Sequence, residues 1–264
     1  MGPHFLIALA ASGVAAGIDC GWSDGELRPP AICAANCRAF VELHQSNRGR
    51  WNWNYYANVS SLISSSPLWS SGLVVEIGTA WGGLALHLLG ALPDVRVASV
   101  DPFLGGYDNA DTMSRYITGL QSKHKLSAAQ VSRERGHAMT HEIRHKHGCR
   151  YRLFNALSTE VAPLVANSTV SVLFIDGDHT LAGVLADIRA WLPKVRPGGL
   201  VVFNDFGGPF RHKFGVRSAV WRSFGGGLGA LGPGATWPVK QEGSGETNCY
   251  IVVPESGNPF IEPV

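Results

Sequence analysis

Two apolar runs in this chain each end in polar side chains that suit chemistry on a cation. The first run, 171–175, is followed by Asp176, Asp178 and His179, and the second, 200–203, is followed by Asn204 and Asp205. Carboxylate and amide oxygens are the ligands that hard divalent cations such as Mg²⁺ prefer, and a histidine can take a proton near neutral pH. The two clusters therefore predict a cation site with a proton acceptor beside it.

The residues between these clusters predict the elements that position them. Leu181–Leu192 has the apolar spacing of a helix, and a Pro-Gly-Gly sequence at 197–199 is typical of a turn. The segment therefore forms a strand–helix–strand unit, in which the two strands are expected to be parallel with a right-handed crossover. Ligands bind at the carboxyl ends of parallel strands, so we expect both polar clusters on one rim of a sheet.

A glycine-rich turn earlier in the chain predicts a second binding element. It follows the apolar strand 73–77 and precedes a helix at 84–92. Glycines let the backbone approach a ligand closely, and the helix beyond them offers free N–H groups at its positive end. The residues of this element with an expected binding role are Glu76, Gly78, Thr79 and Gly82.

An acidic residue stands at the end of the next strand, 95–100. Asp101 lies 25 positions after Glu76, where an acid can accept both hydroxyls of a ribose. The dinucleotide fingerprint would need a glycine at Ala80, so a nicotinamide oxidoreductase is disfavoured. Strands that alternate with helices in this way predict a parallel α/β sheet.

The pattern E-x-G-x-x-x-G, with an acid ending the second strand, resembles the class I S-adenosylmethionine-dependent methyltransferases. The segment FIDGDHTLAGVLADIRAWLPKVRPGGLVVFNDF resembles their metal-dependent small-molecule O-methyltransferase branch, which includes enzymes that act on macrolide sugars and aminocoumarins. The resemblance covers about residues 71–225. It implies a Rossmann-like, doubly wound, mostly parallel sheet with helices on both faces and an antiparallel last strand, expected at Cys249–Val253.

The resemblance also implies a role for each matched residue. The cofactor-binding residues would be Glu76, Gly78, Thr79 and Gly82 on the methionine side, Asp101 at the ribose, Ser158 on the adenine side, and Asp176. The ligands of a divalent metal, expected to be Mg²⁺, would be Asp176, Asn204 and Asp205. His179 would be the general base, with Asp178 as the competing candidate.

Two positions depart from the family pattern. Asn204 stands where an aspartate is usual, which removes one negative charge from the metal site, although an amide oxygen still binds a hard cation. The frequent G-D-S motif on the adenine side reads Ala156-Leu157-Ser158 and lacks its acid. On the crossover helix, Asp187 and Arg189 are expected to face solvent.

These observations predict an S-adenosylmethionine-dependent methyltransferase that acts on a hydroxyl of a small molecule. Two alternatives remain open: a metal-independent methyltransferase of the same fold, and a non-catalytic nucleoside-binding protein. The net charge of +2 favours neither nucleic acid nor a membrane surface as a partner. A homo-oligomer remains possible.

The N-terminal region predicts the organisation and location of the chain. Residues 1–18 resemble a signal peptide or anchor, 19–70 a cap, and 71–264 the methyltransferase domain with a polar helical insertion at 103–149. Five cysteines and two Asn-x-Ser/Thr sequences are compatible with the secretory pathway or an extracellular location. Because S-adenosylmethionine is made in the cytosol, a cytoplasmic location is the alternative. We expect no transmembrane span, because the N-terminal apolar run is too short.

Overall fold

The computed structural model describes 53–80, 82–104, 141–207, 215–224, 240–241 and 248–255, together with the single residues 127, 130 and 136. The predicted signal peptide, residues 19–52 of the predicted cap and most of the predicted 103–149 insertion lie outside this part of the chain. Within the insertion, residues 141–147 are helical. Across the described residues, no helix is both long and apolar enough to cross a bilayer.

A mixed sheet forms the centre of the fold. Its strands are β1 (Leu73–Ile77), β2 (Arg96–Val100), β3 (Tyr151–Phe154), β4 (Val170–Ile175), β5 (Val195–Phe203), β6 (Lys240–Gln241) and β7 (Cys249–Val252). They lie in the order β3-β2-β1-β4-β5-β7-β6. The first five strands are parallel, and β7 is antiparallel to both β5 and β6. The predicted Rossmann-like, mostly parallel sheet with an antiparallel last strand is therefore confirmed.

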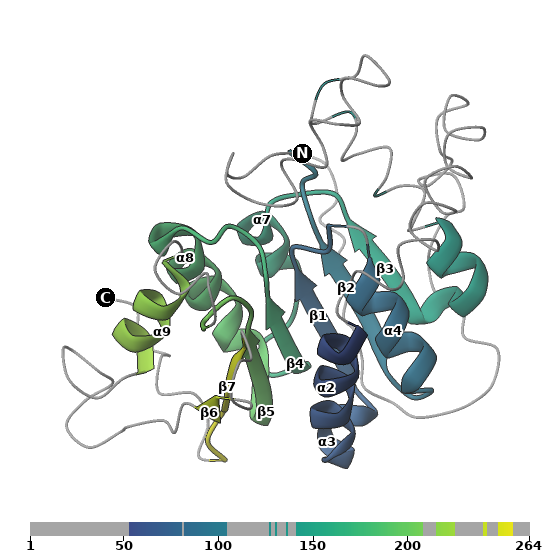
Figure 1. Ribbon diagram of the computed structural model, residues 1–264, viewed down its shortest axis with the longest axis horizontal. Coiled ribbons are helices and arrows are strands. Elements are labelled where there is room, and N and C mark those ends of the chain that lie inside the picture. Colours follow the sequence, from purple (N-terminus) through teal and green to yellow (C-terminus); the bar gives the residue numbers. More distant parts are fainter. Residues whose placement is uncertain are drawn as a thin grey trace.

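Helices cover both faces of this sheet. They are α2 (Trp53–Ser64), α3 (Pro67–Ser70), α4 (Gly83–Ala91), α7 (Ser158–Val161), α8 (Leu181–Trp191) and α9 (Val216–Phe224), with short 3₁₀ turns η2 (Gly148–Arg150), η3 (Ala162–Leu164) and η4 (Leu192–Lys194). Figure 1 shows α2 and α4 to one side of the sheet and α8 and α9 to the other. The part of the predicted cap that the structure describes is thus α2 and α3, and α2 packs on the sheet.

Side-chain alternation along the strands divides the interior into two cores. On β1, Val75 packs with Trp191 of α8, while its neighbour Val74 packs with Leu88 of α4. Successive side chains of a strand point to opposite faces, so a strand with helices on both sides is apolar at nearly every position. Burial of each large apolar side chain stabilises the fold by about 1.5–3 kcal/mol, which holds the rim residues on a rigid support.

Local hydrogen bonds explain where α8 begins and ends. The Thr180 side chain caps the helix by accepting the Gly183 N–H at 3.0 Å. The helix ends at Trp191, one residue earlier than predicted, and Pro193 lies in the 3₁₀ turn that follows. The helix that connects β4 to β5 therefore has the predicted bounds to within one residue.

The predicted turn at 197–199 is wrong, because these residues lie inside β5. Gly198 has a φ of +71°, and its N–H donates to the Val253 carbonyl at 2.9 Å. Its own carbonyl accepts the Trp69 indole N–H at 2.8 Å. The pairing of β4 with β5 shifts register between Val170 and Val172, so the glycines accommodate an irregularity within a strand and do not end it.

Other elements agree with prediction to within a few residues. The helix predicted at 158–165 divides into α7 and η3, and Pro163 lies in the second part. Strand β6 falls in the glycine-rich region and was not predicted. Cys149 and Cys249, the two cysteines that the structure describes, are free thiols, whereas Cys20, Cys33 and Cys37 lie outside the described residues.

Candidate functional site

Backbone hydrogen bonds continue one residue past the carboxyl ends of four parallel strands. They hold the first residue after each strand at one edge of the sheet, the rim. The four backbone donors are Gly78, Asp101, Asp176 and Asn204. Each gives its N–H to the carbonyl of the last residue of a neighbouring strand, at 2.8–3.0 Å. The expectation that both polar clusters share one rim with the glycine turn is therefore confirmed, and the sheet itself holds their backbones in place.

The glycine turn after β1 requires residues without side chains. Gly78 has a φ of +81°, and a Cβ there would lie 2.1 Å from the Asp176 carbonyl oxygen. Gly82 has a φ of +69° and precedes the first turn of α4. Both glycines thus adopt the left-handed conformation that other residues rarely accept. The turn therefore packs closely on the Asp176 backbone and leads directly into the N-terminus of α4, whose first N–H groups have no partner within the helix.

Glu76 is a buried carboxyl behind this turn. Its side chain is 2% exposed, and it accepts the Ser99 hydroxyl at 2.5 Å. Burial raises the pKa of Glu76 to about 7, while the hydrogen bond from Ser99 acts in the opposite direction. Ser99 lies beside Glu76 in the β1–β2 pairing and was missed by the sequence reasoning. The available signal was a serine between Ala98 and Val100 in the buried part of this strand.

Asp101 links the end of β2 to the glycine turn. Its Oδ2 accepts the Ala80 N–H at 2.8 Å, and its Oδ1 accepts the Phe103 N–H at 2.7 Å. Ala80 and Phe103 have positive φ angles of 45° and 49°, so this carboxylate stabilises two strained backbone positions. Burial raises the pKa of Asp101, and the backbone hydrogen bonds oppose that effect.

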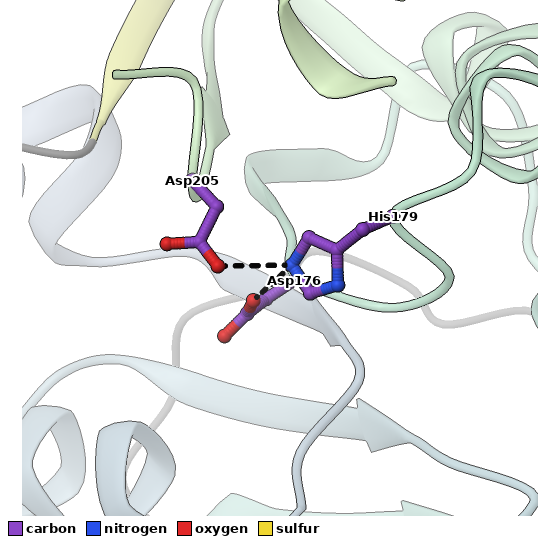
Figure 2. A group of neighbouring side chains, drawn as sticks. All are labelled: Asp176, His179 and Asp205. Atoms are coloured by element: carbon purple, nitrogen blue, oxygen red, sulfur yellow. Dashed lines mark ion pairs between the residues drawn. The ribbon is translucent and has the colours of Figure 1, made fainter. Parts of the chain in front are cut away.

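The second polar cluster gathers around His179. Its Nε2 lies 3.2 Å from Asp176 Oδ1 and 3.4 Å from Asp205 Oδ2. Figure 2 shows the imidazole nitrogen directed at both carboxylates, which come from the ends of different strands. One ligand atom from each of these residues lies within 4.8 Å of the others. The structure thus places His179 inside the cluster that was predicted for Asp176, Asn204 and Asp205.

Asn204 contacts the cluster through its amide. Its Nδ2 donates to Asp176 Oδ1 at 2.5 Å. A half-turn of the amide would present its oxygen in place of the nitrogen. Two carboxylates, one imidazole and one amide oxygen then form a donor set that suits a divalent cation such as Mg²⁺ or Mn²⁺. The residues present therefore fit a metal, with one more candidate ligand than the sequence predicted.

Asp178 has a different environment from its neighbours. Its carboxylate accepts the Thr180 N–H at 2.9 Å and the Thr180 hydroxyl at 3.0 Å. These bonds shape the turn that begins α8, immediately before the capping bond described above. This arrangement favours a structural role for Asp178, and it leaves His179 as the better placed of the two candidate bases.

Ser158 is connected to a buried acid. Its hydroxyl donates to Asp187 of α8, and its carbonyl accepts the Trp191 indole N–H at 3.1 Å. The expectation that Asp187 faces solvent is wrong, because it is 4% exposed, whereas Arg189 is exposed as expected. Asp187 lies on the inner side of α8 with Ile188 and Trp191. Burial raises the pKa of Asp187 to about 6, and the hydrogen bond from Ser158 opposes that rise.

Comparisons with known proteins identify the family and the fold of the chain. The model of a family described as "Methyltransferase domain" matches residues 75–206, which is half of the 264-residue chain. The chain is similar to the crystal structure of CalS11, calicheamicin methyltransferase, with a TM-score of 0.52 and 16% identity over 91% of this chain and 99% of that one. It is also similar to cofactor-bound Rv0187 from MTB, with a TM-score of 0.49 and 16% identity over 88% of this chain and 94% of the other.

A shorter similarity is found among curated proteins. The chain is 33% identical over 89 residues to the uncharacterized protein y4gI of Sinorhizobium fredii (strain NBRC 101917 / NGR234). The matched segment is 34% of this chain and spans 9% of the length of that relative.

Proposed function

The chain belongs to the methyltransferase domain family and has the Rossmann-like methyltransferase fold, and on that premise we propose that it transfers a methyl group from S-adenosylmethionine to a hydroxyl of a small molecule. One observation carries this proposal. The glycine turn and Asp101 share a rim with the cluster of Asp176, His179 and Asp205. A donor site and an acceptor site are thus side by side on one rigid edge of the sheet.

The donor half has the features that S-adenosylmethionine requires. The glycine turn carries the backbone from Gly78 to Gly82 at the N-terminus of α4, where the methionine part would bind with Glu76 and Thr79 beside it. A carboxylate has about four lone-pair sites, so Asp101 would accept a ribose hydroxyl in addition to its backbone hydrogen bonds from Ala80, Phe103 and Thr79. Ser158 remains the proposed residue on the adenine side.

The acceptor half has the features needed to activate a hydroxyl. Asp176, Asn204 and Asp205 would hold a divalent cation, which when bound would lower the pKa of the acceptor hydroxyl. His179 takes the hydroxyl proton on Nε2, while the acceptor oxygen bonds to the methyl carbon and the sulfur–methyl bond breaks. The products are the methyl ether, S-adenosylhomocysteine and a protonated His179. The two carboxylates beside Nε2 stabilise that positive charge.

Turnover by the full-length chain tests this proposal. Methyl transfer from labelled S-adenosylmethionine is measured on a panel of catechols and sugars, first with a chelator and then with added Mg²⁺. Asp176→Ala is expected to abolish the metal-stimulated turnover, because its carboxylate contacts His179 and Asn204, and to weaken S-adenosylmethionine binding far less than turnover. Asp94→Ala removes an exposed acid at the opposite end of the sheet and should change neither quantity. Unchanged turnover in Asp176→Ala would contradict the proposed ligand assignment.

His179 needs a separate test, because its position suits either a base or a metal ligand. We expect His179→Gln to flatten the pH–rate profile near neutrality while Mn²⁺ affinity, measured by electron paramagnetic resonance, stays within about threefold. A loss of Mn²⁺ affinity that parallels the loss of turnover would instead make His179 a ligand.

One observation favours a second candidate function, a metal-independent methyltransferase of the same fold. The Asn204 amide donates to Asp176 Oδ1, so it occupies an oxygen that a cation would need. In that case His179 and its two carboxylates alone would activate the hydroxyl. This candidate predicts turnover that a chelator does not reduce, and an Asn204→Asp variant that gains affinity for Mn²⁺.

A further inference from the structure

A tyrosine from α2 lies directly against the beginning of α4. The two helices pack through matching faces, on which Ser60 Oγ lies 3.2 Å from His87 Nε2 and the rings of Tyr56 and His87 have centroids 6.1 Å apart. A Cβ on Gly83 would lie 2.7 Å from the Tyr56 hydroxyl oxygen. Gly83 is the first residue of α4, so the phenol reaches the edge of the glycine turn.

The negative charges of two carboxylates, Glu76 and Asp176, act on the Tyr56 hydroxyl. Burial, followed by the charges of Glu76 and Asp176, raises the pKa of Tyr56 well above its usual range. The phenol therefore stays protonated at neutral pH, and its oxygen carries two lone pairs in a negatively charged environment. Glu76 belongs to β1 and Asp176 follows β4, which are neighbouring strands. Tyr56 thus lies near the boundary between the donor half and the acceptor half.

If the proposed function is correct, the part of S-adenosylmethionine that lies at this boundary can be deduced. In S-adenosylmethionine the sulfur joins the ribose to the methionine part. With the ribose at Asp101 on β2 and the methionine part at the turn after β1, the sulfur must lie above the end of β1. An acceptor held at Asp176 on β4 then requires the methyl group to point from β1 toward β4. Tyr56 lies at Gly83, beside the turn that follows β1, where the charges of Glu76 on β1 and Asp176 after β4 both act on its hydroxyl.

We propose that the Tyr56 hydroxyl oxygen contacts the methyl group on the sulfonium and orients it toward the acceptor. This inference rests on the proposed function and adds a residue from α2 to it. The hydrogens of a sulfonium methyl group carry partial positive charge, and a phenol oxygen accepts such C–H groups weakly. S-adenosylhomocysteine has a neutral sulfur and no methyl group, so it makes no such contact. Tyr56 therefore favours the charged donor over the neutral product.

Calorimetry of the full-length chain with both ligands tests this contact. Tyr56→Phe removes only the hydroxyl and keeps the ring on Gly83 and His87. We expect it to weaken binding of S-adenosylmethionine by about three- to fivefold and to leave binding of S-adenosylhomocysteine within about twofold. Tyr151→Phe is the matched control, because Tyr151 is a buried tyrosine at the start of β3, away from the rim, and it should change neither affinity.

A second variant approaches the same contact from α4. Gly83→Ala places a methyl group where it must displace the Tyr56 hydroxyl, so it should cause the same selective loss. Combining it with Tyr56→Phe should add little, because both changes remove one contact. Gly90→Ala, in the same helix with nothing within 4 Å of the added carbon, is its control.

The outcomes separate this inference from the proposed function. If the unaltered chain binds neither ligand, the proposed function fails. If it binds both, and Tyr56→Phe weakens both equally or weakens neither, the proposed function stands and the role of Tyr56 is overturned. Equal loss of both ligands in Gly83→Ala would also contradict the contact.

Discussion

Replacing Glu76 by glutamine should change how the stability of the protein depends on pH. Glu76 is buried, and burial raises its pKa from the ordinary 4.5 to about 7. The folded state therefore holds the Glu76 proton more tightly than the unfolded state does. Below pH 4.5 Glu76 is protonated in both the folded and the unfolded state, so it does not reduce the free energy of unfolding. As pH rises toward 7, the unfolded state ionises first and the folded state loses stability relative to it.

The size of the effect follows from the two pKa values. The ordinary pKa of 4.5 and the folded-state pKa of about 7 differ by a factor of several hundred in proton affinity, which corresponds to a full cost of about 3–4 kcal/mol well above pH 7. Glu76→Gln cannot ionise, and its side-chain oxygen can still accept the Ser99 hydroxyl. We therefore expect the variant to match the natural protein near pH 4.5 and to exceed it by up to about 3 kcal/mol at pH 8.

Urea unfolding without ligand at pH 5, 6, 7 and 8 measures this difference. Asp101 and Asp187 also have raised pKa values, so only the difference between the two proteins at each pH isolates Glu76. Asp94→Asn makes the same kind of change at an exposed acid and should leave the pH dependence of the natural protein unchanged. A difference between Glu76→Gln and the natural protein that is constant from pH 5 to pH 8 would refute the reasoning.

Three further predictions follow from single contacts. Gly78→Ala should destabilise the fold by several kcal/mol in urea unfolding, because φ is +81° and the new carbon meets the Asp176 carbonyl, whereas Gly90→Ala in open space should stabilise it by about 0.5–1 kcal/mol. Ser158→Ala removes a hydrogen bond that lowers the pKa of Asp187, so the carbon-13 NMR titration of this carboxyl should move to higher pH; an unchanged midpoint would contradict the contact. Trp191→Phe should cost about 1–3 kcal/mol in the same unfolding assay, because it loses buried area and a hydrogen bond to Ser158, and an unaltered midpoint would argue against both.

The sheet could be predicted from the sequence because its strands are buried on both faces. Leu73–Ile77 and Val170–Ile175 are short runs that are buried at every position, and such runs have few alternatives to a central strand. The rim followed from the same reasoning, since polar residues that end parallel strands must share one edge. The order of strands and helices along the chain is therefore enough to predict that Asp176 and Asn204 lie on the same edge of the sheet.

The contacts between distant elements could not be predicted, because they depend on how helices pack. Asp187 looks like a surface residue on a helix, yet α8 turns it toward Ser158, 29 positions away. No motif in the sequence distinguishes Tyr56, and only the packing of α2 on α4 brings it to Gly83. The Pro-Gly-Gly sequence at 197–199 is compatible with a turn or a strand irregularity, and pairing with β4 and β7 decides between them.

Binding of S-adenosylmethionine to the full-length chain tests the central claim most directly. Isothermal titration calorimetry at pH 7.5, with and without Mg²⁺, should show saturable binding of one molecule per chain. Gly78→Ala brings its new carbon to 2.1 Å from the Asp176 carbonyl oxygen, so it must distort the turn and should abolish the heat of binding, whereas Gly90→Ala should retain it. No detectable binding by a folded, unaltered chain under either condition would contradict the account.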